Sequence, residues 1–210
     1  MNGWHTWLHS LIGMLVIVNP LLAVPAFTVL TGGEDRTERR ATANHAALTV
    51  AIVLTLSVLG GQAVLRFFGI GIPAFQVGGG ILILLMAIAM LHARMSGARH
   101  TDEEAAEAQA KEQVGVVPLG IPLLAGPGSI STAIIYAHNG GGWPDLLVLV
   151  LEVWLVSALV WLSLRLGDRV AQILGTTGIN IATRIMGLIL AAIAVGFITS
   201  GLKQLLPGLA

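Results

Sequence analysis

The sequence predicts an all-α membrane protein with six transmembrane helices, arranged as two inverted three-helix repeats in which helices one and four are broken at proline-rich motifs. Three observations predict this fold: a scarcity of charge, apolar runs long enough to cross a bilayer, and a proline motif that recurs in each half. Of the 210 residues, 55% are hydrophobic and only 10% are charged. Soluble domains carry about 25% charged residues, so this chain has too little charge to cover a soluble surface.

Six long apolar stretches each predict one membrane-spanning helix. A helix needs roughly 20 apolar residues to cross a hydrocarbon core about 30 Å thick, and continuous rather than alternating apolar runs favour helices over a β-barrel. The stretches are 1–33, 41–65, 67–93, 113–144, 146–164 and 185–202, and the only charged side chain within them is Glu152. One large soluble core is the alternative, and so many consecutive spans disfavour it.

The distribution of basic residues predicts that both chain ends lie outside. If six helices alternate in direction, nine of the eleven basic residues fall on one side, and the positive-inside rule places that side in the cytoplasm. The nine are Arg36, Arg39, Arg40, Arg94, Arg99, Lys111, Arg165, Arg169 and Arg184. Only Arg66 and Lys203 fall on the other side. The formal net charge is zero, which gives no bulk attraction to nucleic acid.

A polar stretch divides the chain into two halves that resemble each other. Residues 96–113 form a predicted cytoplasmic linker, either solvated or a partner-binding arm, between a first three-helix repeat, 1–95, and a second, 114–210. The letters "PLLAVP" at 20–25 match "PLLAGP" at 122–127, and a weaker match begins at Gly71 and Gly178. Because each half holds an odd number of helices, the second half enters the membrane from the opposite side, as in many secondary transporters.

The proline motifs predict broken helices that line a small polar site. A proline inside a helix costs about 3 kcal/mol or more, and hydrocarbon offers no water to the carbonyl groups that it frees. A helix that restarts at Pro127 presents free amides and hydroxyls, which favour an anion such as a carboxylate. Kinks that only shape the bundle are the alternative. The candidate substrate-binding residues are Asn19, Pro20, Pro25, Thr28, Gly126, Pro127, Gly128, Ser129, Ser131 and Thr132.

Both motifs resemble those of a known family. "VNPLLAVPAF" in the first half and "GIPLLAGPGSISTAI" in the second are similar to the signature segments of the MarC family of bacterial inner-membrane proteins. That family includes SnatA-type transporters of small neutral amino acids and belongs to a wider group of LysE-like exporters. The resemblance covers essentially the whole chain and implies a multi-pass transporter of the bacterial inner membrane. One departure is Asn19, which stands where the family motif has an acidic residue before its proline.

A few polar residues within the apolar stretches are further candidates. Glu152 could couple transport to a proton or act in gating, or it could be a packed or interfacial carboxylate. Gln76, Asn180 and Thr183 fall near corresponding places in helices three and six, where they either line the cavity or hydrogen-bond neighbouring helices. The histidines do not show helical metal-ligand spacing, and the chain has no cysteine. We therefore expect no metal site and no cofactor.

These observations favour transport over catalysis. We expect a secondary transporter that moves small polar solutes, such as glycine or alanine, by alternating access, with the lipid bilayer, the solute and a coupling proton or Na⁺ as its partners. We expect no enzymatic activity, because the sequence has no HExxH motif, no paired intramembrane aspartates and no Ser–His pairing. A channel or a non-transport membrane scaffold remains the alternative, since broken helices also line pores. The sequence leaves the oligomeric state open.

Overall fold

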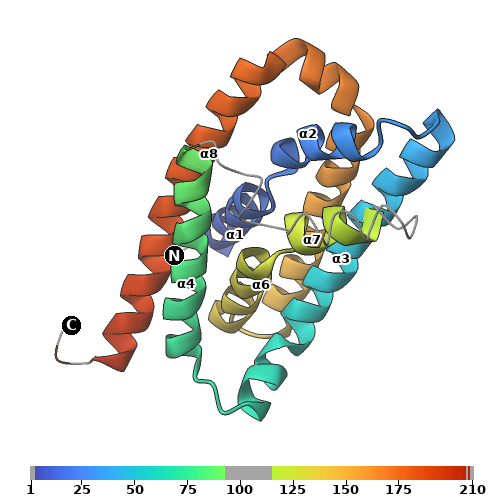
Figure 1. Cartoon of the computed structure of the whole chain (residues 1–210). Coiled ribbons are helices and arrows are strands. Elements are labelled where there is room, and N and C mark those ends of the chain that lie inside the picture. Colours follow the sequence, from blue (N-terminus) through green and yellow to red (C-terminus); the bar gives the residue numbers. More distant parts are fainter. Residues whose placement is uncertain (1–2, 93–114, 207, 209–210) are drawn as a thin grey trace.

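The computed structural model describes residues 3–92, 115–206 and 208, and it confirms the all-α prediction for them (Figure 1). The expected linker, 96–113, lies outside these residues. The helices are α1 (Gly3–Val18), α2 (Pro20–Leu30), α3 (Arg36–Phe67), α4 (Ile72–Leu91), η1 (Gly115–Leu124), α6 (Pro127–Asn139), α7 (Trp143–Arg165) and α8 (Gly167–Leu205). The described residues contain no β-strand.

Five helical segments of the described part are long and apolar enough to cross a membrane. They are His5–Leu30, Arg36–Phe67, Ile72–Leu91, Trp143–Arg165 and Thr177–Leu205. The remaining expected span falls on η1 and α6, which have 10 and 13 residues. Each of the two is shorter than the roughly 20 residues that a single crossing needs.

The first apolar segment changes direction at Asn19. This residue has φ 48° and ψ 72°, so it separates α1 from α2 with a left-handed turn. It is the one non-glycine residue with positive φ in the described part of the chain, and asparagine is among the few side chains that tolerate this region. Pro20 then occupies the first position of α2, where a missing amide hydrogen leaves no helical bond unmade.

The second proline motif unwinds over a longer stretch. Val117 and Ile121 have extended dihedral angles within η1, and the Ala125 amide donates to the Gly120 carbonyl over 2.9 Å. A Cβ at Gly120 would lie 2.7 Å from the side chain of Thr49. The irregular backbone therefore lies directly against α3 at Gly120, while the side chains of Val117 and Ile121 are exposed. Regular helix resumes at Pro127, with Gly126 as the extended cap residue.

Two helix pairs flank these interrupted segments. Figure 1 shows α4 beside α8 at one side of the molecule and α3 with α7 at the other, with α1, α2, η1 and α6 between them. Glycine permits the close approach of α4 and α8, because a Cβ at Gly80 would lie 2.9 Å from the Ala194 carbonyl oxygen. Near its start α8 bends at Gly175, which has φ 60°. The central segments thus form a layer between two pairs of long helices.

Candidate functional site

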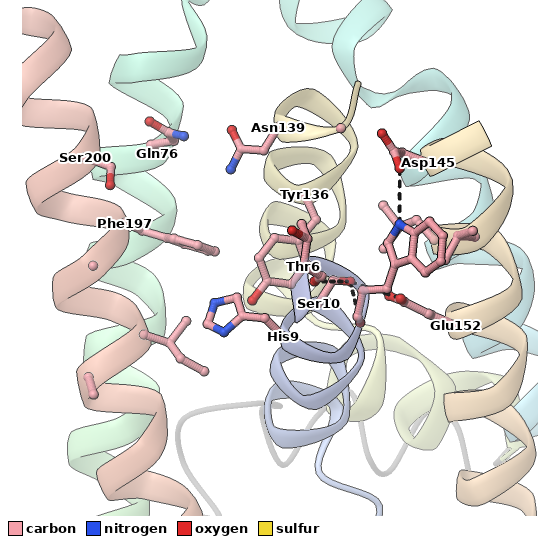
Figure 2. A pocket seen from close by; sticks show the side chains of 17 residues that line it. Thr6, His9, Ser10, Gln76, Tyr136, Asn139, Asp145, Glu152, Phe197 and Ser200 are labelled. Carbon is pink, nitrogen blue, oxygen red and sulfur yellow. Dashed lines mark hydrogen bonds between the residues drawn. The ribbon is translucent and has the colours of Figure 1, made fainter. Parts of the chain in front are cut away.

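A polar pocket lies at the end of the bundle where α6 passes into α7. Its volume is about 700 Å³, and side chains from α1, α4, α6, α7 and α8 line it (Figure 2). Because an apolar membrane bundle has little reason to gather hydrophilic groups, this concentration marks the pocket as a functional candidate. We call this cavity the polar pocket. Its polar lining residues are Thr6, Trp7, His9, Ser10, Gln76, Tyr136, Asn139, Asp145, Glu152 and Ser200.

Glu152 is the buried acid of the polar pocket. Its side chain is 7% exposed, and its Oε1 accepts a hydrogen bond of 3.0 Å from the Ser10 hydroxyl of α1. Its other carboxylate oxygen, Oε2, is buried and finds no hydrogen-bond partner among the described residues. A buried carboxylate oxygen without a partner is costly, so this atom is available to a ligand that brings a donor.

Tyr136 supplies a second buried oxygen without a partner. Its hydroxyl finds no hydrogen-bond partner within the described part of the chain. The ring packs edge-to-face with Phe197 of α8 at 5.8 Å and with His9 of α1 at 6.3 Å. Gly13 leaves room for the hydroxyl, because a Cβ there would overlap it. The hydroxyl can therefore donate to a ligand while its ring is held by two neighbouring helices.

Two further contacts hold the walls of the polar pocket together. The Trp7 indole donates to Asp145 over 3.1 Å, which joins the beginning of α1 to the beginning of α7. Gln204 of α8 donates to Gln76 of α4 over 3.2 Å. The Trp7–Asp145 and Gln204–Gln76 hydrogen bonds each join helices that are distant in the sequence. Asp145 and Glu152 are seven residues apart on α7, which is about two helical turns, and so they face the same pocket.

Only two of the fourteen residues predicted from the sequence, Gln76 and Glu152, line the polar pocket. Asn180 is exposed on α8, and Thr183 is buried there without lining it. Sequence reasoning missed Ser10 and Tyr136. No local pattern marks either, because their role depends on contacts between α1, α6 and α7.

The ten motif residues lie at the two helix interruptions rather than around the polar pocket. Pro25 and Pro127 are exposed, and Thr28 is partly buried. The other seven, which are Asn19, Pro20, Gly126, Gly128, Ser129, Ser131 and Thr132, are buried.

Most hydroxyls of the motifs are bonded to nearby carbonyls. Thr28 donates to Val24 over 3.0 Å, Ser129 donates to Leu124 over 2.8 Å, and Thr132 donates to Gly128 over 2.9 Å. Ser129 thereby satisfies one carbonyl at the end of η1. In contrast, the Asn19 side-chain amide nitrogen is buried with no hydrogen-bond partner among the described residues. Asn19 is therefore the motif residue with a buried side-chain atom that finds no hydrogen-bond partner among the described residues.

The two interruptions approach each other inside the bundle. A Cβ at Gly128 would lie 3.5 Å from Ile17, two residues before Asn19, and 2.8 Å from the Met86 sulfur of α4. The start of α6 therefore packs against α1 and α4, and the space that the sequence assigned to an anion is filled by side chains in this conformation. The described residues hold no group of three or more His, Asp or Glu side chains that could bind a metal ion.

Comparison with known proteins agrees with this architecture. The sequence model described as "MarC family integral membrane protein" matches residues 4–206. A UPF0056 membrane protein of Buchnera aphidicola (strain APS) is 37% identical over 97% of this chain and 94% of its own length. The Escherichia coli (strain K12) UPF0056 membrane protein YhcE is 36% identical over 94% and 92%, and Bacillus subtilis (strain 168) YvbG is 36% identical over 95% of both chains. No solved structure matches. The chain therefore belongs to the MarC family of integral membrane proteins.

Proposed function

We propose that this protein is a secondary transporter of small polar solutes, with small neutral amino acids such as glycine and alanine as its substrates, and that it works by alternating access. The observation that carries the proposal is the polar pocket, in which the Glu152 Oε2 and the Tyr136 hydroxyl are both buried without a partner among the described residues. Each buried group without a partner leaves a bond that a bound solute can make.

The chemistry of the polar pocket matches a zwitterion. An ammonium group donates to a carboxylate oxygen, which Glu152 provides, and a carboxylate accepts from a hydroxyl, which Tyr136 provides. Both side chains line the same pocket (Figure 2). His9 and Phe197 pack against the Tyr136 ring and form an aromatic wall beside its hydroxyl. Small neutral amino acids carry both charged groups of the zwitterion, and we propose them as the solutes on that ground.

Alternating access requires a bundle that can open at either end, and an inverted repeat supplies one. Six spans in two inverted halves, 1–95 and 114–210, are supported by the packing of the helices: α3 packs against its counterpart α7, and α4 packs against its counterpart α8. The first part of each broken helix packs against the second part of the other, α1 against α6 and η1 against α2. The restart positions also agree, since Pro20 and Pro127 are 107 residues apart (127 minus 20), as are Gly71 and Gly178 (178 minus 71). We propose that the helix interruptions at Asn19 and Gly126 are the places at which the bundle changes conformation during alternating access.

The same proposal includes location and coupling. In the bacterial inner membrane, the positive-inside rule places the polar pocket outside, because the arginine-rich end of the bundle is opposite to it. The solute then enters from outside or leaves to it through the polar pocket. Glu152 is our candidate for coupling to a proton or Na⁺. A carboxylate that binds the solute and the coupling ion in turn can link their movements across the membrane.

The decisive experiment measures labelled glycine and alanine flux in proteoliposomes, with and without a proton or Na⁺ gradient. We expect saturable flux, acceleration by unlabelled amino acid on the opposite side, and at least a tenfold loss in Glu152→Gln. The matched control is Glu34→Gln, which removes the same charge from the other end of the bundle, where Glu34 accepts a hydrogen bond from Thr42. Flux that neither saturates nor shows counterflow would indicate a channel, and no flux of any amino acid would contradict the proposal.

A further inference from the structure

The opposite end of the bundle holds a second pocket that the transport proposal does not use. It has a volume of about 460 Å³ and is lined by Phe27, Leu164, Leu166 and five arginines. We call this cavity the arginine pocket. Its five arginines are Arg36, Arg39, Arg40, Arg165 and Arg169. Every charged side chain among the described residues that line this pocket is therefore positive. A loose excess of basic residues satisfies the positive-inside rule, but it does not require five of them to surround one cavity.

The arginines converge from two connections that are far apart in the sequence. Arg36, Arg39 and Arg40 belong to the first turns of α3, whereas Arg165 ends α7 and Arg169 lies in the first turns of α8. Helices α3 and α7 pack together, and this brings the two groups to one end of the bundle. Like charges around one cavity repel each other, so the arrangement is most stable when an anion lies among them.

Contacts with aromatic rings fix two of these guanidinium groups. Arg39 lies over the Phe27 ring at 5.5 Å, and its Nε donates to the Thr31 hydroxyl over 3.1 Å. Arg165 lies over the Trp161 ring at 4.7 Å, and the Trp161 indole in turn donates to Asn44 of α3 over 2.7 Å. These contacts hold the planar groups in position, which lowers the entropy that binding an anion costs.

The nearby carboxylates of the α2–α3 connection are directed elsewhere. Asp35 accepts from the Thr37 and Glu38 amides, and Glu38 accepts from the Asp35 amide, which forms a capping box at the start of α3. Glu34 accepts from the Thr42 hydroxyl at 3.0 Å. These acids therefore form hydrogen bonds within the α2–α3 connection and the first turns of α3.

We infer that the arginine pocket binds a phosphate group. Guanidinium groups bind phosphate oxygens in pairs of charge-assisted hydrogen bonds. Two membrane-crossing segments have their terminal residues here, Arg36 and Arg165, which places the cavity at the depth of lipid headgroups. Buried Phe27 and Leu164 give it an apolar wall. The phosphate is carried either by an anionic phospholipid, whose chains lie along the helices, or by a soluble phosphate compound.

The test compares two triple variants with the same loss of charge. One carries Arg36→Gln, Arg40→Gln and Arg169→Gln, all at exposed positions. The control carries Arg66→Gln, Arg184→Gln and Lys203→Gln, which do not line the arginine pocket. Each protein, purified in a neutral detergent, is titrated with dioleoyl-phosphatidylglycerol, dioleoyl-phosphatidylcholine or inorganic phosphate. The shift of the unfolding temperature gives the apparent affinity, because a ligand of the native state raises it.

We expect phosphatidylglycerol to bind at least tenfold more weakly to the pocket variant than to the wild type, with little change in the control. Binding of phosphatidylglycerol that inorganic phosphate does not reproduce would identify a lipid, and equal binding of both would identify a soluble phosphate compound. If the triple variant does not fold, Arg169→Gln alone should weaken binding about fivefold. An equal loss in both triples, or no preference for the two net anions, phosphatidylglycerol and inorganic phosphate, over the zwitterionic phosphatidylcholine, would overturn the inference.

Discussion

At the scale of single residues, the Tyr136 hydroxyl separates a functional from a structural role most clearly. It is buried without a hydrogen-bond partner among the described residues, so Tyr136→Phe removes a group that contributes nothing to folding. We expect an unfolding temperature equal to or above that of the wild type, together with a roughly twofold to tenfold rise in KM for amino acid transport, the range of one hydrogen bond. Thermal unfolding in detergent and proteoliposome flux measure the two effects.

The control for this prediction is Tyr136→Ala. It also removes the ring contacts with Phe197 and His9, so it should destabilise the fold by about 3–5 kcal/mol. A lower unfolding temperature in Tyr136→Phe would show that the hydroxyl stabilises the native state, which would contradict the assignment to a ligand.

Asn19 provides a second prediction at this scale, because its conformation and its side chain can be tested separately. Its φ of 48° is a left-handed value that costs most side chains about 1–2 kcal/mol. Asn19→Gly should therefore fold at least as stably as the wild type, whereas Asn19→Ala should lose about 1–2 kcal/mol. Chemical unfolding of the two variants gives the difference. Equal stability of both would show that α1 and α2 join in another way.

Some residues of the polar pocket can be predicted from the sequence, and others cannot. Glu152 was readable as a site residue because it is the one charged side chain in its apolar stretch. Its partner Ser10 was not, since a hydrogen bond across 142 residues leaves no trace in local pattern. The match between the two proline motifs aligns Pro20 with Pro122. In the structure, the regular helices after the two interruptions begin at Pro20 and at Pro127, five residues later in the second half than this alignment predicts. Unwinding of η1 accounts for this shift of five residues in the second half.

At the scale of helices, the triplet from Gly78 to Gly80 supplies its own control. A Cβ at Gly80 would lie 2.7 Å from Ile198 and 2.9 Å from the Ala194 carbonyl oxygen, while a Cβ at Gly78 would have nothing within 4 Å. Gly80→Ala should therefore destabilise the protein by about 1–3 kcal/mol. Gly78→Ala should be neutral or slightly stabilising, because alanine is the better helix former. Unfolding in detergent compares the pair.

The result also decides between two interpretations of the triplet. If the glycines serve close packing of α4 on α8, the position within the triplet determines the effect, and transport follows stability. If they serve as a hinge, Gly78→Ala should reduce the transport rate without changing stability. The predicted contrast between Gly80 and Gly78 would be wrong if both variants lost stability equally.

At the scale of the whole molecule, the polar pocket relates the two ends of the chain. Thr6 near one end and Ser200 near the other line it together, so α1 begins and α8 ends on the same side of the bundle. The arginine pocket occupies the opposite side. The topology that we propose accordingly has an even number of membrane crossings, and in it η1 with α6 supply the crossing that neither is long enough to make alone. Five of the described basic residues line the arginine pocket at that side: Arg36, Arg39, Arg40, Arg165 and Arg169.

This topology can be tested without altering the native background, because the chain contains no cysteine. In intact cells, Ser200→Cys should react with a membrane-impermeant maleimide, whereas Arg169→Cys should react only after the membrane is opened. A reporter fused after Ala210 should behave as external. Labelling at Arg169→Cys alone in intact cells would place the arginine pocket outside and reverse the orientation. Labelling of both cysteines from outside would mean that the two pockets do not lie on opposite sides of the membrane, which would contradict the proposed six-span topology.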